Sequence, residues 1–95
     1  MPRYNVFYNG KWACYSSIVD DFITDFMTID EYEKWRDFEY GRSKPPLNQN
    51  QMSIGEAALG MCLNKKPDSV RANAKQLGID EAIIETALKK IEVPS

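Results

Sequence analysis

Carboxylates are the first side chains in this sequence that could do chemistry. The acidic residues between positions 20 and 31 offer the oxygen ligands that Mg²⁺ and Ca²⁺ prefer, and they are Asp20, Asp21, Asp25, Asp30 and Glu31. Their spacing does not match an EF-hand loop. The first three alternate with an apolar stripe, and the face opposite such a stripe is normally charged and solvated. We therefore interpret the cluster as a solvated helix face, and we expect neither a metal nor a cofactor.

Nucleophilic catalysis lacks its usual partners here. The chain has no histidine, which excludes Ser-His-Asp and Cys-His systems and His-ligated zinc. Ser16 and Ser17 lie in neither a nucleophile elbow nor a Ser-x-x-Lys motif. Cys14 and Cys62 have no metal-ligand spacing, and the favoured interpretation is two reduced, buried thiols. We expect a protein without enzymatic activity.

A cytoplasmic location is expected from the same residues. Reduced cysteines are typical of that compartment, and the N-terminal residues lack the apolar stretch of a secretory signal peptide. No apolar run in the 95 residues approaches the length that spans a membrane. The net charge of −2 is too small to steer a partner by itself.

Residues 70–91 have the spacing of a helix-turn-helix. Ala74 precedes the turn glycine Gly78 by four positions, and Ile84 follows it by six, as in units that place a second helix in the major groove. The outward positions of that second helix are mostly acidic, and acids repel phosphates. We favour two packed helices without DNA. The alternative function is a transcriptional regulator that contacts DNA through Arg71, Lys75, Thr86, Lys89 and Lys90.

The aromatic residues define a third candidate site, because all of them lie within the first forty positions. Asn9-Gly10 predicts a two-residue hairpin turn, which sets Phe7 opposite Trp12 and places Cys14 on their face. We expect helices to cover this face, with Phe7, Trp12, Phe22, Phe26 and Trp35 building the core. The opposite face is the candidate protein-contact surface, formed by Tyr4, Val6, Tyr8, Lys11 and Tyr15. An open face of this kind could also stack the bases of RNA, although only Arg3 and Lys11 would flank it with positive charge. Packing of that face on the C-terminal helices or on a second copy is the favoured alternative.

About five short helices should follow the hairpin. The first would begin near Ser17 and carry an apolar stripe to Met27, although the second strand could instead continue through 16–19. Thr28 and Glu31 form a capping box that opens the next helix, and Gly41 ends it. Three C-terminal helices should begin at Ser53, at Asp68 or Ser69, and at Asp80, with Gly78 between the last two.

These elements predict a small α+β fold, an N-terminal β-hairpin followed by about five short α-helices, in one domain over residues 1–95. Residues 1–41 hold the hairpin and two helices, 42–52 form a proline-containing linker, and 53–93 form a three-helix part. The expected function is protein binding as an adaptor or inhibitor, of the kind that phages and mobile elements carry as accessory proteins. The partner is another protein or a second copy, paired through the hairpin, and no membrane is involved.

Overall fold

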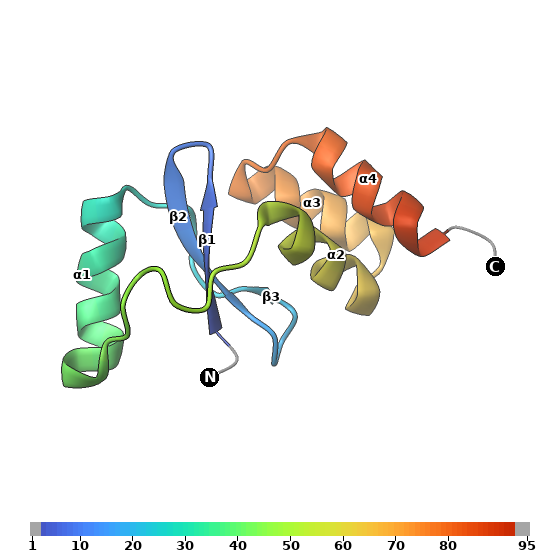
Figure 1. Cartoon of the computed structure of the whole chain (residues 1–95). Coiled ribbons are helices and arrows are strands. Elements are labelled where there is room, and N and C mark those ends of the chain that lie inside the picture. The colour runs from blue at the N-terminus through green and yellow to red at the C-terminus, as the bar shows by residue number, and fades with distance from the viewer. Residues whose placement is uncertain (1–2, 93–95) are drawn as a thin grey trace.

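A helix, a small sheet and a group of three helices form three successive layers (Figure 1). The computed structural model describes residues 3–92. The antiparallel sheet has the order β1 (Arg3–Tyr8), β2 (Lys11–Ser16) and β3 (Asp21–Phe22). The helical elements are α1 (Ile29–Tyr40), the 3₁₀ turn η1 (Gly41–Ser43), α2 (Ile54–Asn64), α3 (Pro67–Leu77) and α4 (Glu81–Glu92). The predicted α+β class is confirmed, with four α-helices within the described residues instead of about five.

The N-terminal hairpin has the predicted register. Phe7 pairs with Trp12, and Tyr8 pairs with Lys11 across the turn. Asn9 and Gly10 have φ angles of 52° and 77°, the left-handed conformations that a type I′ turn requires at both central positions. The Asn-Gly pair therefore fixes which residues share each face of the sheet.

The helix predicted over 17–27 does not form. After β2 the chain makes a tight turn, in which Asp20 has a φ of 51°, and returns as β3 beside β2, with Phe22 opposite Tyr15. Ile18 and Val19 lie in the turn and are exposed. The apolar spacing suited a helix, but the strand pairing and the edge-to-face contact between Tyr15 and Phe22, with ring centroids 5.4 Å apart, favour the hairpin.

Helices cover both faces of the hairpin: α1 covers the Phe7 face, as expected, and the C-terminal helices cover the opposite face, as the favoured interpretation of that face allowed. On that face α1 stacks Tyr32 on Trp12, with ring centroids 6.1 Å apart. Phe7 nevertheless remains 54% exposed. The expectation that Phe7 is a core residue is therefore wrong, since a single helix is too narrow to cover the whole face.

The opposite face contributes to the main core. Val6 and Tyr15 have exposed fractions of 0% and 1%. They pack against a largely aliphatic set from the C-terminal helices, Ala57, Ala58, Met61, Cys62, Val70, Ala74, Ile79, Ile84, Ala87 and Leu88. The expectation of an open tyrosine face is wrong, and the favoured alternative, packing on the C-terminal helices, is confirmed for these two residues.

Local signals set most of the helix ends correctly. Thr28 and Glu31 form the predicted capping box of α1, and Ser53 accepts a hydrogen bond from the Glu56 N–H at the start of α2. Asp80 accepts one from the Ala82 N–H at the start of α4. The exception is α3, which begins at Pro67 with no side-chain cap, in place of the expected cap at Asp68 or Ser69; proline is well suited to a first helical turn.

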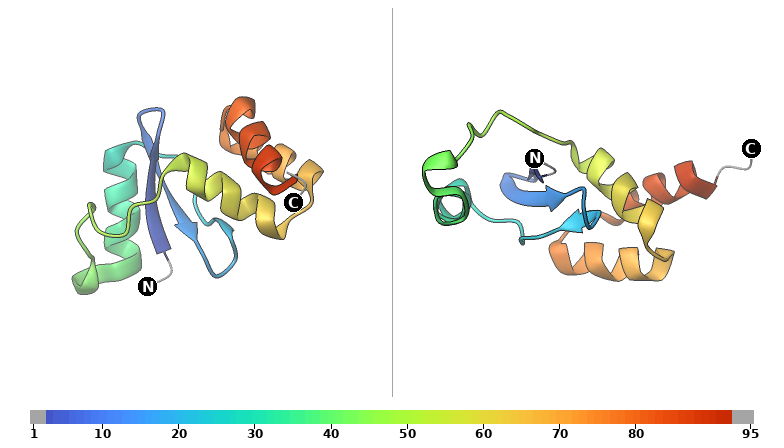
Figure 2. Two further views of the ribbon diagram at one scale, coloured as in Figure 1. Left: turned by 45° about the vertical axis from the view of Figure 1, so that its right-hand side comes forward. Right: turned by 90° about the horizontal axis from the view of Figure 1, so that it is seen from below.

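The linker between η1 and α2 runs along the outer edge of β1, while the segment from β3 to α1 runs along the other edge of the sheet (Figure 2). Asn5 holds the linker through backbone hydrogen bonds to Asn50 and Met52. Its side-chain Nδ2 donates to the carbonyl oxygens of Leu47 and Gln49 at 3.0 and 3.2 Å. The β1 edge is therefore occupied, so a dimer formed by adding a second hairpin there would first have to displace the linker.

We expect the stability of the protein to fall above pH 10. Burial raises the pKa of Tyr15 and of Tyr32 above their ordinary value of about 10. Above that pH the unfolded chain releases tyrosine protons that the native state retains. This release stabilises the unfolded state and therefore lowers the free energy of unfolding. Each of these tyrosines should remove about 1.4 kcal/mol of unfolding free energy per pH unit.

Urea unfolding followed by circular dichroism at pH 8, 10 and 11 measures this loss. The Tyr32→Phe variant should show a shallower decline than the wild type between pH 10 and pH 11. An unfolding free energy that stays constant over this range, or an unaltered slope in the variant, would contradict the prediction.

Candidate functional site

The segment 21–27 forms the second edge of the sheet and the floor of the candidate site. Its Ile23 N–H donates to the Cys14 carbonyl at 2.9 Å, and Met27 exchanges two backbone hydrogen bonds with Trp12, at 2.7 and 2.8 Å. Thr24 Oγ1 accepts from the Cys14 N–H at 3.0 Å. These contacts hold the segment beside β2 although only two of its residues form a regular strand.

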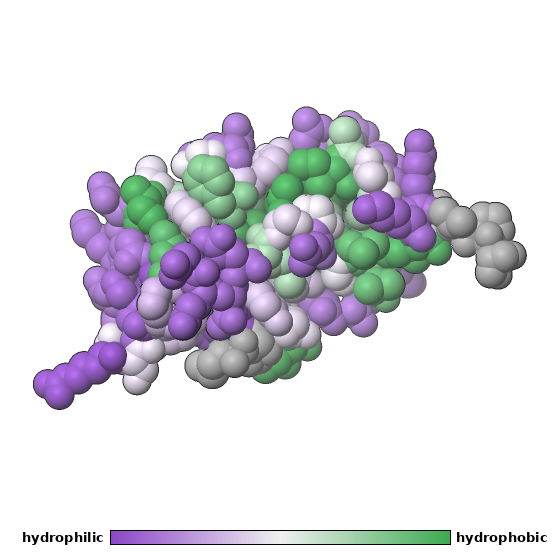
Figure 3. Space-filling model, viewed as in Figure 1, coloured by the Kyte–Doolittle hydropathy of each residue, from purple (hydrophilic) through white to green (hydrophobic). Residues whose placement is uncertain are grey.

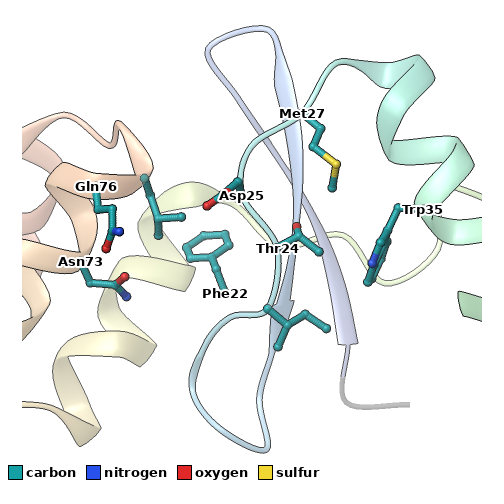
Figure 4. Close-up of a pocket in the computed structure, with 9 residues that line it drawn as sticks. Phe22, Thr24, Asp25, Met27, Trp35, Asn73 and Gln76 are labelled. Atoms are coloured by element: carbon teal, nitrogen blue, oxygen red, sulfur yellow. The ribbon is translucent and has the colours of Figure 1, made fainter.

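A groove of about 460 Å³ opens along this segment, between α1 and α3. Figure 4 shows Asn73 and Gln76 of α3 on one side and Met27 and Trp35 on the other, with Phe22 and Asp25 between them. Ile23 also lines the groove and is 40% exposed. The groove thus offers apolar contact area near its floor and amide groups on one wall.

The edge of the sheet at this groove is poorly suited to pairing with another strand. The Phe22 N–H is taken by the Asp21 carboxylate at 2.7 Å, and Asp25 places an exposed charge on the segment. Short edge strands and charged side chains are common means of preventing edge-to-edge pairing. The site can therefore receive side chains of a partner more readily than an added strand.

The predicted tyrosine surface is largely occupied by the protein itself. Val6 and Tyr15 are buried, and Tyr4 and Tyr8 are half-buried. The Asp80 N–H donates to the Tyr8 hydroxyl at 2.9 Å. Lys11 is exposed at the hairpin turn. These five residues do not form one accessible face.

The residues of the DNA-binding alternative lie on α3 and α4, on either side of the Gly78 turn. The guanidinium of Arg71 makes two hydrogen bonds to the Glu85 carboxylate, at 2.8 and 3.1 Å, and a third to Asp68. The Thr86 hydroxyl donates to the Ala82 carbonyl of its own helix. The remaining three residues, Lys75, Lys89 and Lys90, are exposed. Because Arg71 is neutralised by a neighbouring acid, this geometry gives DNA binding no added support.

The acidic cluster is not the solvated helix face that we expected. Asp21 accepts hydrogen bonds from Lys65 and, at 2.8 Å, from Asn73. Asp20 accepts from Tyr15 at 3.4 Å and from Asn64 at 2.6 Å. The first two acids therefore join the β2–β3 turn to α2 and α3. In the described part of the chain, no group of three or more cysteine or acidic side chains is placed to hold a metal ion.

Sequence reasoning did not identify the groove. Ile23 and Met27 belonged to the apolar stripe of a helix that does not form, and Asn73 and Gln76 carried no distinguishing pattern. The alternative extension of the second strand through 16–19 is wrong as well, because β2 ends at Ser16 and residues 17–20 form the turn before β3. Phe22, Met27 and Trp35 are of residue types enriched at interfaces, but nothing in the sequence indicated that they would share one groove.

No protein-family model matches the chain, and no curated protein or solved structure matches it either. Within residues 3–92, none of the helices has the length and apolar character needed to cross a membrane.

Proposed function

We propose that the chain is a non-enzymatic binding protein, an adaptor or inhibitor, that contacts another protein through the groove beside residues 22–27. The supporting observation is that the groove brings Ile23, Met27 and Trp35 together at the one edge of the sheet that the linker does not occupy. Its location is proposed to be the cytoplasm, where the buried free thiols of Cys14 and Cys62 would stay reduced.

The residue types in the groove suit protein recognition. Tryptophan and methionine are enriched in protein interfaces, and methionine adapts its shape to different partners. Exposed apolar side chains also occur outside the groove, since Phe7 on β1 is 54% and Ile29 on α1 is 42% exposed. On the face seen in Figure 3, hydrophobic residues likewise reach the surface in several places.

The proposed partner inserts apolar side chains. Asn73 and Gln76 on the α3 wall would then hydrogen-bond the backbone or polar groups that flank those side chains. Strand addition is disfavoured by the Asp21 and Asp25 carboxylates described above. A centre of apolar contacts surrounded by polar groups is the usual anatomy of a protein interface.

Photo-cross-linking from the groove tests this proposal. A photoreactive phenylalanine analogue at Gln76, expressed in the cells from which the chain originates, should give a defined covalent product. The same analogue at Glu56, an exposed position on α2 outside the groove, is the matched control and should not. Adding Ile23→Glu should lower the Gln76 product about tenfold or more, because a charge would enter the apolar contact.

The mass of the product distinguishes the two kinds of partner. A product at twice the mass of the chain indicates a second copy, and any other defined mass indicates a different protein. Equal products from Gln76 and Glu56, or a Gln76 product that Ile23→Glu leaves unchanged, would rule out the groove as the contact surface.

A further inference from the structure

A second cavity, of about 210 Å³, lies at the opposite edge of the sheet, between β1, α1 and the linker. Most of its lining residues are of polar types, and they include Arg3, Arg36, Tyr40, Ser43, Gln49 and Asn50. Hydrophilic side chains gather at this end of the molecule in Figure 3. Among the described residues, no aspartate or glutamate lines the cavity, and the acids that pair with its two arginines, Glu39 and Glu33, contact them from outside the lining.

Arg36 is the most unusual residue of this cavity. It lies on the inner face of α1 with an exposed fraction of 1%. Its Nη1 donates to Glu33 at 2.5 Å, and its Nη2 donates to the Pro45 carbonyl. Its Nε is buried and has no hydrogen-bond partner within the described residues. A buried guanidinium normally has its donors satisfied, so a missing partner at this cavity points to an unfilled anion site.

The carboxylate that balances Arg36 is shared. Glu33 Oε2 also accepts from Lys44 at 3.0 Å, and Lys44 contacts Asp37 at 2.6 Å. Glu33 therefore bridges Arg36 and Lys44, and Asp37 adds a second carboxylate to Lys44, so the cluster holds two cations and two acids. Glu33 contacts Arg36 only at Nη1, which leaves Nε as the donor that an anion in the cavity would satisfy.

Arg3 supplies a second positive group at the cavity. Its guanidinium lies over the Tyr40 ring at 5.8 Å and donates to Glu39 at 3.1 Å. Glu39 is not part of the cavity lining, so it binds Arg3 from outside. Hydrogen bonding to Tyr40 raises the pKa of Arg3, and the side chain is cationic at any pH at which the protein is folded.

We propose that this cavity binds a small oxyanion, a carboxylate or a phosphate group, held by hydrogen bonds from the guanidinium groups of Arg3 and Arg36. Guanidinium groups bind both anions through paired hydrogen bonds. Ser43, Gln49 and Asn50 add neutral hydroxyl and amide donors to the same cavity. The proposal is independent of the protein contact at the groove, since no residue lines both sites.

NMR titration of the ¹⁵N-labelled chain tests the proposal. Sodium phosphate and sodium acetate are added in separate series, with sodium chloride maintaining the ionic strength. We expect saturable changes in the amide chemical shifts of residues 36–50, with a dissociation constant of about 1–10 mM for at least one anion. Saturation by one anion alone identifies the group that the cavity prefers. Chemical-shift changes that stay linear in the concentration of both anions, or that centre on residues outside the cavity, would overturn the proposal.

Three surface variants make the test specific. Arg3→Gln should lower the affinity for the anion about tenfold, because one charge-assisted contact is lost. Glu39→Gln should strengthen binding, since the competing carboxylate on Arg3 is removed. Arg42→Gln, an exposed arginine on η1 outside the cavity, is the matched control and should change little. The same affinity in the Arg3 and Arg42 variants would show that the shifts do not report this site.

Discussion

Gly60→Ala should destabilise the protein by about 2–3 kcal/mol, although alanine is the better helix former. Gly60 lies within α2, against the buried Tyr15. A methyl group at Gly60 would overlap the Tyr15 hydroxyl oxygen and come within 3.1 Å of its Cζ. Tyr15 is 1% exposed and cannot swing away. Urea unfolding of the variant and the wild type measures the difference.

A matched control lies on the same helix. Gly55 has open space around it, because a methyl carbon added there would lie 3.9 Å from Ser53 Oγ, an ordinary contact distance. Gly55→Ala should therefore be neutral or stabilise by up to about 1 kcal/mol. In a Tyr15→Phe background, the cost of Gly60→Ala should fall by about 1 kcal/mol, because the overlapping oxygen is gone. Equal effects at the two glycines would show that Tyr15 does not pack on Gly60.

Asn5→Ala should cost about 3 kcal/mol of unfolding free energy. Its Oδ1 accepts from the Tyr32 hydroxyl at 2.5 Å, and Tyr32 is fully buried. The substitution leaves that hydroxyl without its acceptor and removes both side-chain hydrogen bonds to the linker. Unsatisfied buried groups are the expensive part of such a change. Hydrogen exchange of the 47–52 amides should accelerate as the linker loosens.

Asn48→Ala provides the comparison for Asn5. It is the same substitution at an exposed position of the linker, and surface changes of this kind usually stay within about 0.5 kcal/mol. Tyr32→Phe breaks the hydrogen bond to Asn5 from the other side. The double variant Asn5→Ala/Tyr32→Phe should therefore lose less than the sum of the two single changes. Strict additivity would show that the two side chains are not coupled.

The hairpin and most helix ends could be predicted because they depend on neighbouring residues. Asn9-Gly10 selects its turn without help from the rest of the chain. The capping box of Thr28 and Glu31 and the left-handed Gly78 likewise act within one helical turn. These signals give correct positions whatever tertiary contacts follow.

Burial was harder to predict because it depends on distant segments. The tyrosine face is buried by α2, α3 and α4, which begin far along the chain at Ile54, Pro67 and Glu81. The segment 17–27 had apolar residues at helical spacing, but its pairing with β2 overrode that local preference. Strand formation is generally more dependent on context than helix formation.

The buried face of α1 illustrates how the second cavity escaped prediction. The aromatic stripe at intervals of three drifts around a helix that has 3.6 residues per turn. By Phe38 it has rotated away from the sheet, and that side chain is 87% exposed. Tyr32 and Arg36, four residues apart, occupy the inward positions instead. Because Arg36 is charged, the pattern of apolar residues in the sequence did not indicate that this position faces inward.

The position of Asn5 also orders events during synthesis. β1 and β2 leave the ribosome before the helices and can pair at once, since their contact is local. Asn5 must then wait for the carbonyl groups of Leu47 and Gln49, and Val6 must wait for helices that extend to Glu92. The face of the nascent hairpin that carries Val6 and Tyr15 therefore stays uncovered until α2, α3 and α4 have been made. Truncated chains that end before α4 should accordingly aggregate or be degraded.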